Sequence, residues 1–485
     1  MNSVIKLIKI FIVSFCLFNS VDAQFSILHN FSGGINDGST PYGGLIKSGL
    51  LLYGTTNNGG TNDTGTVFQI NANGTNFSLL HSFDPDTEGS RPTLNTLLLS
   101  DTALYGMATS YGSDDFNGSV FRMDTDGSHF QILHVFSGNE GKWPYSSLIE
   151  SDSVLYGMTT YGGNNTSPGY SGCGTVFRMR KDGTGFRVLH TFTGSPDDGH
   201  GPHNSLIIDG DILYGMTSVG GSYGYSGNEV GYGTIFKIDT AGNNYQIIHH
   251  FSGGIHDGKW PCGSLYKVGT ILYGTTYYGG NSDKGTIFKI NSSGTDFELL
   301  YSFSGSDSEN PSSSLILNGE FFYGATSGNG TNNYGILYEI GKNGTGFRIL
   351  HNFNESNGHA PQGDILLSDS TLFGVTVEGG DYGMGTVYAL KLRNPTGSDD
   401  IKTSDKSDVI IYPNPTSGLF TLSFNSTLVL EFKVVIYNTN GKQVFSETYY
   451  NTTMALINLT GCPAGMYLVK VNDNGKSHAA MITKE

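Results

Sequence analysis

Three short sequence markers recur along the chain at intervals of about 50 residues, and they constrain the fold more than any other feature. The first marker, Leu-Tyr-Gly, has its aromatic residue at Tyr53, Tyr105, Tyr156, Tyr214, Tyr273, Tyr323 and Phe373. The second, Gly-Thr-Val-Phe with close variants, begins at Gly65, Gly118, Gly174, Gly233, Gly285, Gly335 and Gly385. The third, Phe-x-x-Leu-His-x-Phe with variants, begins at Phe25, Phe77, Phe130, Phe186, Tyr245, Phe297 and Phe347. We number the repeats 1 to 7 by their Leu-Tyr-Gly.

Each repeat contains four short runs rich in β-branched and aromatic residues, and turn residues bound every run. In repeat 1 these runs cover residues 43–47, 50–56, 65–71 and 77–83. Four strands in about 50 residues is the size of one propeller blade. The third marker at Phe25 precedes repeat 1, whereas repeat 7 has no copy after it, so we expect strand 25–31 to complete the seventh blade. The sequence therefore predicts an all-β fold, with a seven-bladed β-propeller over residues 24–393.

Composition and charge exclude several classes of protein. Glycine accounts for 70 of 485 residues and charged residues for only 14%, which argues against long helices. The formal net charge of −16 argues against a nucleic-acid binder, which would need a basic surface. Residues 1–23 have the pattern of a secretory signal peptide, and no later apolar run is long enough for a membrane span. We expect a secreted monomer.

The repeat markers also carry a family resemblance. Leu52-Tyr-Gly-Thr-Thr56, Gly59-Gly60 and Gly65-Thr-Val-Phe68 resemble the GloVer (Gloeo/Verruco) tandem repeat of secreted bacterial proteins. The resemblance covers all seven repeats and implies a secreted or surface protein. It implies no particular activity.

The chain after the repeats has a different pattern. Residues 394–408 form a polar linker without aromatic residues, and residues 409–485 predict a small Ig-like β-sandwich. This segment resembles the type A C-terminal sorting domain of the Bacteroidetes type IX secretion system, through Tyr412, Pro413, Asn414, Pro415, Gly418, Gly465 and Tyr467. The resemblance implies that residues 409–485 engage the type IX machinery. It places the protein outside the cell or on the outer-membrane surface.

Histidine is the first candidate for chemistry, because it occupies one position of the third marker in six of the seven copies: His29, His81, His134, His190, His249 and His351. The remaining copy has Tyr301 there, so we expect packed, hydrogen-bonded structural residues. No cofactor is expected, although asparagine- and aspartate-rich loops such as Asn281–Gly285 could bind calcium or form simple turns. Pairing of Cys173 with Cys262 stays open.

The repeats are unequal in one sector, which suggests a binding surface. The segment between the second and third strands is longer in repeats 3 and 4, and both tryptophans lie in loops that enter repeats 3 and 5. Aromatic faces suit stacking on sugar rings. The candidate ligand-binding residues are Trp143, Tyr161, Tyr170, His200, His203, Tyr223, Tyr225 and Trp260. The alternative is that the tryptophans only cap the repeats and that the insertions have drifted.

These observations favour a secreted or cell-surface protein that binds a glycan or another polymer, and they assign no catalytic residue. One alternative is a carbohydrate-active enzyme whose carboxylates would come from Asp114, Asp115, Asp197, Asp198, Glu229 and Asp257. A second alternative is a structural or adhesive protein with a protein partner.

Overall fold

The computed structural model describes residues 24–92, 96–110, 117–163, 172–224, 231–328, 330, 333–392, 409–412, 419–424, 431–438, 441–450, 454–473 and 476–484. All helices and strands assigned within these residues are β-strands, with no helix among them, which confirms the predicted all-β class. The chain divides into two compact units, Met1–Lys391 and Leu392–Glu485. Each unit is described by itself.

The described part of the first unit contains seven antiparallel sheets of four or five strands each. Repeats 1 to 3 form the sheets β3 (Ile46–Ser48), β4 (Leu51–Thr56), β6 (Thr66–Asn71), β7 (Ser78–Ser82); β8 (Leu98–Ser100), β9 (Ala103–Ala108), β10 (Ser119–Asp124), β11 (Gln131–Val135); and β12 (Ile149–Ser151), β13 (Val154–Thr159), β14 (Thr175–Arg180), β15 (Arg187–Thr191). A separate short pair joins β2 (Gly38–Ser39) to β5 (Asn58–Gly59).

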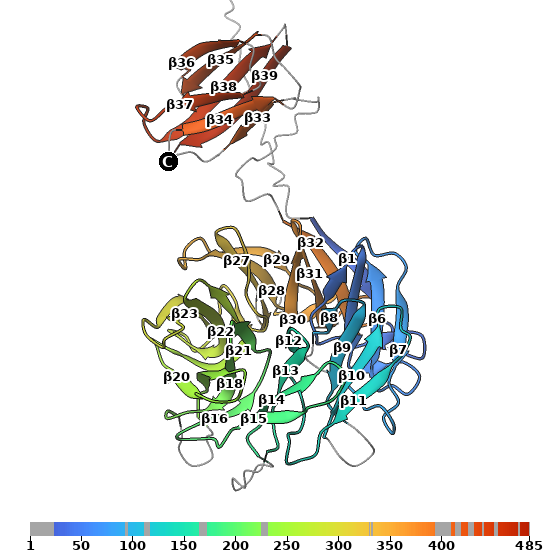
Figure 1. Ribbon diagram of the computed structural model, residues 1–485. Helices are drawn as coiled ribbons and strands as arrows, with labels where there is room; N and C mark the ends of the chain where they lie inside the picture. Colours follow the sequence, from blue (N-terminus) through green and yellow to red (C-terminus); the bar gives the residue numbers. More distant parts are fainter. Residues whose placement is uncertain are drawn as a thin grey trace, which may run out of the picture. The chain divides into compact units, whose positions relative to one another are not determined.

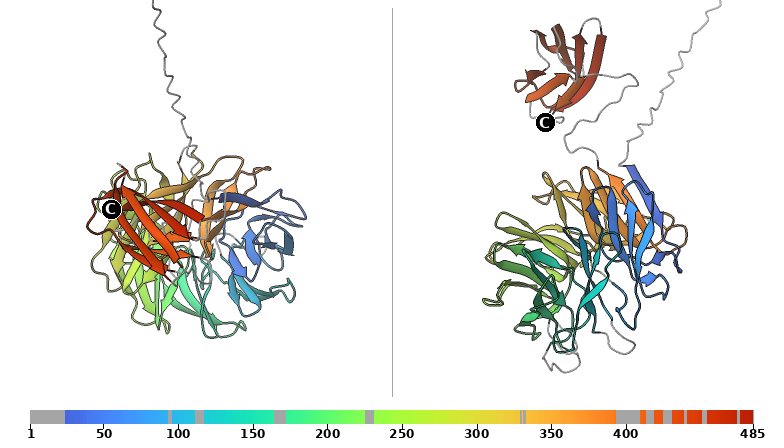
Figure 2. Two further views of the ribbon diagram at one scale, coloured as in Figure 1. Left: turned by 90° about the horizontal axis from the view of Figure 1, so that it is seen from above. Right: turned by 45° about the vertical axis from the view of Figure 1, so that its right-hand side comes forward.

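Repeats 4 to 7 follow the same plan. Their sheets are β16 (Gly199–Pro202), β17 (Ile207–Asp209), β18 (Ile212–Gly220), β19 (Thr234–Asp239), β20 (Gln246–His250); β21 (Gly258–Val268), β22 (Ile271–Gly279), β23 (Thr286–Asn291), β24 (Glu298–Ser302); β25 (Glu309–Pro311), β26 (Ile316–Asn318), β27 (Phe321–Gly328), β28 (Ile336–Gly341), β29 (Arg348–Asn352); and β30 (His359–Ser368), β31 (Thr371–Glu378), β32 (Thr386–Lys391), β1 (Gln24–Asn30). Seen from above, the sheets follow one another around the unit in colour order, from blue to orange (Figure 2, left).

Two of the sequence markers form one packing unit in the middle of each sheet. Gly54 of the first marker pairs with Phe68 of the second marker on the neighbouring strand. A Cβ at Gly54 would lie 2.5 Å from the Phe68 ring and 2.8 Å from Leu45, so only glycine leaves room for the aromatic ring. The glycine of Leu-Tyr-Gly and the last residue of Gly-Thr-Val-Phe therefore depend on each other.

The first strand of the chain completes the sheet of the last repeat. β1 pairs antiparallel with β32, with Phe25 opposite Leu390 (Figure 1). Phe25 also stacks on His351 at a centroid distance of 3.7 Å. Phe31, just after β1, is fully buried against Phe68 of repeat 1. The N-terminal segment thus joins the last repeat to the first.

The second unit consists of two antiparallel sheets around one hydrophobic core. The three-stranded sheet is β33 (Val409–Tyr412), β34 (Leu419–Phe424), β37 (Met454–Asn458), and the four-stranded sheet is β36 (Gln443–Tyr450), β35 (Glu431–Asn438), β38 (Gly465–Asp473), β39 (Lys476–Lys484). Buried residues of both sheets, such as Phe420 and Val434, share the core. The assignment of residues 409–485 as an Ig-like β-sandwich stays a prediction.

We predict that Phe31→Ala lowers the free energy of unfolding of the first unit by about 3–5 kcal/mol, because it empties a fully buried aromatic site. The control is Ser26→Ala on the exposed side of β1, the strand just before Phe31, and it is expected to change the free energy of unfolding by less than about 0.5 kcal/mol. Both tryptophans lie in the first unit, so their fluorescence in a guanidinium titration follows that unit alone. Equal midpoints for the two variants would contradict the joining role of Phe31.

Candidate functional site

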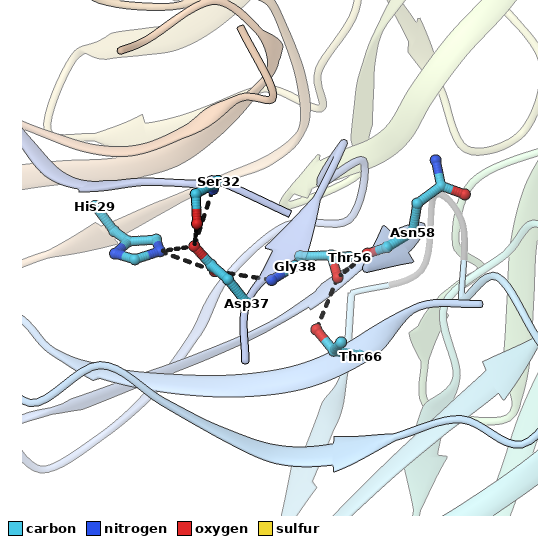
Figure 3. Close-up of polar contacts among 7 residues, drawn as sticks. All are labelled: His29, Ser32, Asp37, Gly38, Thr56, Asn58 and Thr66. Atoms are coloured by element: carbon cyan, nitrogen blue, oxygen red, sulfur yellow. Dashed lines mark hydrogen bonds and ion pairs between the residues drawn. The ribbon is translucent and has the colours of Figure 1, made fainter. Parts of the chain in front are cut away.

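Each loop that connects one repeat to the next is fastened by an acceptor side chain that is buried or half-buried. In the loop before repeat 1 this acceptor is Asp37, which lies 3.1 Å from His29 Nε2. Asp37 also accepts hydrogen bonds from the Ser32 N–H and hydroxyl at 2.9 and 2.8 Å, and from the Gly38 N–H at 2.8 Å. Figure 3 shows Asp37 at the centre of these contacts. We call a strand histidine and the loop carboxylate that it contacts a histidine latch.

The loop is then joined to the strands of its own repeat. Thr56 donates its hydroxyl to the Asn58 carbonyl at 2.8 Å and lies 2.7 Å from the Thr66 hydroxyl (Figure 3). Gly38 lies directly over Thr56, since a Cβ at Gly38 would come within 2.3 Å of its methyl group. The loop therefore has little freedom to move away from the sheet.

The histidine latch recurs around the first unit. The other histidine–carboxylate distances are 2.8 Å for His81–Glu88, 3.4 Å for His134–Glu140, 3.1 Å for His190–Asp198 and 3.3 Å for His249–Asp257. Tyr301 replaces the histidine once and donates its hydroxyl to Asp307. Each ring also stacks on the first aromatic residue of the next third marker, as His29 does on Phe77 at 3.7 Å. The histidine rings are packed, as predicted. The predicted hydrogen bonds are present for four of the six, His29, His81, His190 and His249, whereas His134 Nε2 and His351 Nε2 are buried without one.

The latch shifts the pKa of several of its members. Burial raises the pKa of Asp37, but hydrogen bonds from His29 and Ser32 outweigh it and hold the pKa below its usual value. Asp198 behaves in the same way, with hydrogen bonds from His190 and Tyr245. Burial also lowers, to about 4, the pKa of His351, the third-marker histidine that faces Asn357 and belongs to no latch. These groups therefore keep their charge state over the neutral range.

The carboxylates considered for catalysis differ in how the structure places them. Asp198 and Asp257 are only 5% and 6% exposed and belong to histidine latches. Asp197 is exposed, whereas Asp114, Asp115 and Glu229 lie outside the described residues. Asp198 and Asp257 are thus occupied in holding loops.

The described part of the chain bears on two features, clusters of His, Cys, Asp and Glu side chains and disulfide bonds. Within it, no group of three or more His, Cys, Asp or Glu side chains is placed to hold a metal ion. Cys173 and Cys262 are not joined by a disulfide bond, so the bridge considered from the sequence is not formed. Burial raises the pKa of the Cys262 thiol to about 12, and its Sγ lies 2.9 Å from the Pro311 carbonyl.

Trp143 is the centre of a group of aromatic side chains contributed by repeats 3 and 4. Its ring meets Tyr161 edge-on at a centroid distance of 5.2 Å and lies 6.0 Å from Tyr145. Tyr145 stacks on His203 at 5.7 Å, and Tyr161 meets His200 at 5.9 Å. We call these five residues the Trp143 cluster. It combines two predicted aromatic residues, Trp143 and Tyr161, and both predicted histidines with Tyr145, which was not predicted.

The backbone holds the two loops of this cluster together. Lys142 and Tyr161 exchange backbone hydrogen bonds of 2.7 and 3.1 Å, and the Thr160 N–H donates to the Trp143 carbonyl at 3.1 Å. Burial lowers the pKa of His200, and burial lowers that of His203 to about 4. Both imidazoles are therefore neutral near pH 7 and available as hydrogen-bonding rather than charged groups.

Trp260 belongs to a second group of aromatic side chains. It is 44% exposed and meets Tyr278 at 5.3 Å, and Tyr278 in turn meets Tyr277 at 4.9 Å. The Lys259 ammonium lies 5.5 Å from the Tyr278 ring centroid and 5.7 Å from that of Tyr232. We call these residues the Trp260 cluster.

Trp143, Tyr161, His200 and His203 of the predicted platform thus lie in one aromatic cluster and Trp260 in another; whether they form a single platform stays a prediction. Tyr223 is 52% exposed and has no recorded ring contact with either cluster among the described residues. Tyr170 and Tyr225 lie outside the described residues. The sequence argument missed Tyr145 and Tyr278, although Tyr145 follows Trp143-Pro144 directly.

Both tryptophans occupy the same backbone position, which recurs seven times. The residue before the first proline of each repeat has a positive φ: Thr40, Arg91, Trp143, Gly201, Trp260, Asn310 and Ala360, with values from 49° to 63°. The following proline is wedged against a glycine of the preceding repeat, since a Cβ at Gly118 would lie 2.5 Å from Pro144. The backbone is thus constant at this position while the side chain varies.

The sorting motif is only partly described. Tyr412 ends β33, and Pro413, Asn414, Pro415 and Gly418 lie outside the described residues. Tyr467 on β38 is buried in the core of the second unit and donates its hydroxyl to the Pro463 carbonyl at 2.6 Å. Gly465 begins β38 with a φ of 146°.

We predict that Asp198→Ala lowers the free energy of unfolding of the first unit by about 3–5 kcal/mol, because it leaves several buried donors without an acceptor. Its exposed neighbour provides the control, and Asp197→Ala should change the same quantity by less than about 0.5 kcal/mol. Tryptophan fluorescence in denaturant measures both. A small effect of Asp198→Ala would show that the latch does not stabilise the unit.

We also predict that the first unit loses stability as the pH falls from about 6.5 to 3. The unfolded chain protonates His134 and His351 near 6.5, whereas the folded chain resists protonation, so stability declines toward pH 4. Below 3.8 the lowered pKa values of Asp37 and Asp198 act in the same direction. His351→Tyr, the residue that one copy already has, should flatten the decline between pH 6.5 and 4. An unchanged slope would refute this assignment.

Known proteins resemble separate parts of the chain. The secretion system C-terminal sorting domain matches residues 410–485, which confirms the predicted type IX sorting domain and indicates secretion or cell-surface export. The described residues contain no helix long and apolar enough to cross a membrane. An endo-acting ulvan lyase of Formosa agariphila is 34% identical over 80 residues, which are 16% of this chain and 15% of that protein. So short a match does not carry over its activity.

Solved structures show a looser likeness. Putative 6-phosphogluconolactonases of Bacteroides uniformis and Bacteroides fragilis are 12% and 11% identical, each with a TM-score of 0.41. The matches cover 85% and 86% of this chain and 99% and 98% of those proteins, but scores this low carry no activity over. The model of the Gloeobacter/Verrucomicrobia repeat matches residues 15–227 and 225–419. Since these matches span most of its length, the chain belongs to the Gloeobacter/Verrucomicrobia repeat family.

Proposed function

We propose that residues 24–392 form a seven-bladed β-propeller that binds a glycan or another polymer through the Trp143 cluster. The second unit directs this propeller through the type IX secretion system. The observation that carries the binding proposal is the side chain at Trp143, a large aromatic residue at a backbone position that other repeats fill with Thr40, Gly201 or Ala360.

The propeller assignment is supported by the plan of the sheets. Seven sheets have the same strand order, and β1 pairs with β32, which is how a ring of blades is closed without free edges. The loops that connect the sheets are tied back by the latches. Such loops on a rigid scaffold are where binding residues usually lie.

The backbone at Trp143 supports a role beyond packing. A non-glycine residue with positive φ is strained by roughly 1–2 kcal/mol, and Gly201 occupies the equivalent position of repeat 4 without this strain. Repeats with Thr40 or Ala360 at the position keep the same backbone, so the fold does not require tryptophan there. A strained, partly exposed aromatic side chain fits a ligand contact.

The chemistry of the Trp143 cluster suits a carbohydrate. Flat aromatic faces stack on sugar rings, and Tyr145 and Tyr161 add hydroxyl groups beside them. His203, with a pKa of about 4, is neutral near pH 7 and can exchange hydrogen bonds with sugar hydroxyl groups. The Trp260 cluster, with Lys259 among its rings, suits a second contact along the same polymer.

The two alternatives differ in what they require of this surface. A carbohydrate-active enzyme would need two free carboxylates, but the histidine latches occupy Asp198 and Asp257. A structural or adhesive protein would use the same aromatic side chains against a protein partner, because tyrosine and tryptophan are also common at protein interfaces. We expect the chain to act as a monomer without a cofactor.

We predict that the chain from Gln24 onward binds polysaccharide on a glycan array and that Trp143→Ala weakens this binding at least 10-fold. The matched control is Tyr382→Ala, which removes a 62% exposed aromatic side chain outside both clusters. It should bind like the parent chain, and all three proteins should unfold at the same temperature.

Three results separate the alternatives. Equal loss of binding in both variants would contradict the Trp143 cluster as the site. Shortening of the bound polysaccharide, abolished by Asp197→Asn, would favour the enzyme. Absence of any glycan binding, with capture of one defined protein that depends on Trp143, would favour the adhesive protein.

A further inference from the structure

One position of the repeat brings small polar side chains together from separate sheets. It is the residue just before the inner leucine or isoleucine of each repeat, and it is occupied by Gly44, Thr96, Ser147, Ser205, Ser264, Ser314 and Asp364. Five of the seven carry a hydroxyl group and only one carries a charge. We call them the hydroxyl ring.

Hydrogen bonds link consecutive members of the hydroxyl ring. The backbone N–H of one repeat donates to the hydroxyl oxygen of the next, at 2.9 Å from Thr96 to Ser147, 2.9 Å from Ser205 to Ser264 and 2.6 Å from Ser264 to Ser314. The backbone N–H of Gly44 donates to Thr96 in the same way at 3.1 Å. Each oxygen keeps a second lone pair for another partner.

The last repeat contributes a carboxylate where the others have hydroxyl groups. Asp364 accepts hydrogen bonds from both the N–H and the hydroxyl of Ser314, and its other oxygen lies 3.5 Å from the Thr96 hydroxyl. A Cβ at Gly44 would lie 2.6 Å from the Thr96 hydroxyl and 3.0 Å from the Asp364 Cβ. Glycine at that position therefore leaves the space through which Asp364 approaches Thr96.

These residues line a small cavity. Its wall includes Ser147, Ser205, Ser264, Ser314 and Asp364, together with the Asn204 amide. The cavity volume is about 20 Å³, which is room for one water molecule or one monatomic ion but not for a sugar. The polar atoms of these side chains are oxygens except for the amide nitrogen of Asn204.

The hydrogen-bond partners of Asp364 stabilise its carboxylate only in part, because none of them supplies a positive charge. Its described hydrogen-bond partners are neutral groups, and burial raises the pKa of its carboxyl group. Asp364 is half-buried, and a carboxylate whose hydrogen-bond partners are all neutral is stabilised by a cation beside it. Oxygen ligands select hard cations over transition metals.

We propose that this cavity binds one hard monovalent cation of the size of sodium, held by Asp364 and by serine hydroxyl oxygens of the hydroxyl ring. The volume limits the occupant to a single ion, and one negative charge is balanced by one positive charge. A calcium ion would leave a net positive charge, and calcium sites ordinarily use several carboxylates. The site is separate from the aromatic clusters and does not depend on the proposed glycan binding.

The test uses thermal unfolding of the chain from Gln24 onward, followed by tryptophan fluorescence, in sodium chloride and in choline chloride at equal concentration. Because a ligand of the folded state raises the unfolding temperature, we expect sodium to raise it by about 1–3 °C at 0.5 M. Asp364→Ser, which introduces the residue of the other repeats, should fold and abolish this difference. Asp369→Asn removes an exposed carboxylate of the same repeat and should keep it.

Sodium-23 NMR provides a second, direct readout. The parent chain and Asp369→Asn should broaden the sodium signal, and Asp364→Ser should not. A sodium response that persists in Asp364→Ser would overturn the site. A response to calcium chloride but not to sodium chloride would overturn the monovalent assignment. The absence of any ion-specific response in the parent chain would mean that a proton alone balances Asp364, and would also overturn it.

Discussion

The contact on which the first unit depends is an aromatic ring packed over a glycine on the neighbouring strand. Phe68 over Gly54 is one example, and both residues belong to sequence markers that recur seven times. The ring leaves no space for a side chain at the glycine. The aromatic ring therefore packs directly against the glycine backbone, and both residues are buried. The next aromatic ring, Phe31, packs against Phe68 and carries the contact to the preceding strand of the chain.

From that core the polar contacts extend outward to the loops. The histidine of each third marker stacks on the next repeat and holds, in most copies, the acidic residue that fastens the loop. The loop carboxylate contacts the histidine, and the histidine stacks on an aromatic ring of the next repeat. The position of each such loop is therefore coupled to the aromatic core. Trp143 and Trp260 stand on such loops, at a backbone position held by proline and glycine contacts. For the proposed ligand, loops held in place before binding would lower the entropy lost on binding.

The sequence alone predicts most of the fold and less of the site. Marker spacing predicts the strands, and the extra marker at Phe25 points to the pairing of the first strand with the last repeat. The replacement of histidine by Tyr301 in one copy predicts a structural role for the histidines, but the acidic loop residues that they contact were not predicted. The separation of the two tryptophans into different clusters was not predictable, because it depends on contacts across loops such as Tyr145 with His203. The proposed role of Asp364 was not predicted either, because it depends on five hydroxyl-bearing residues that come from other repeats of the chain.

The central claim is that a rigid scaffold presents the Trp143 cluster to a polymer. Hydrogen exchange of the chain from Gln24 onward, with and without a bound polysaccharide, tests it most directly. The account predicts slower exchange on binding at residues 142–145 and 199–203, with no change at 380–384. Slowing confined to other loops, or spread evenly over the seven sheets, would contradict it.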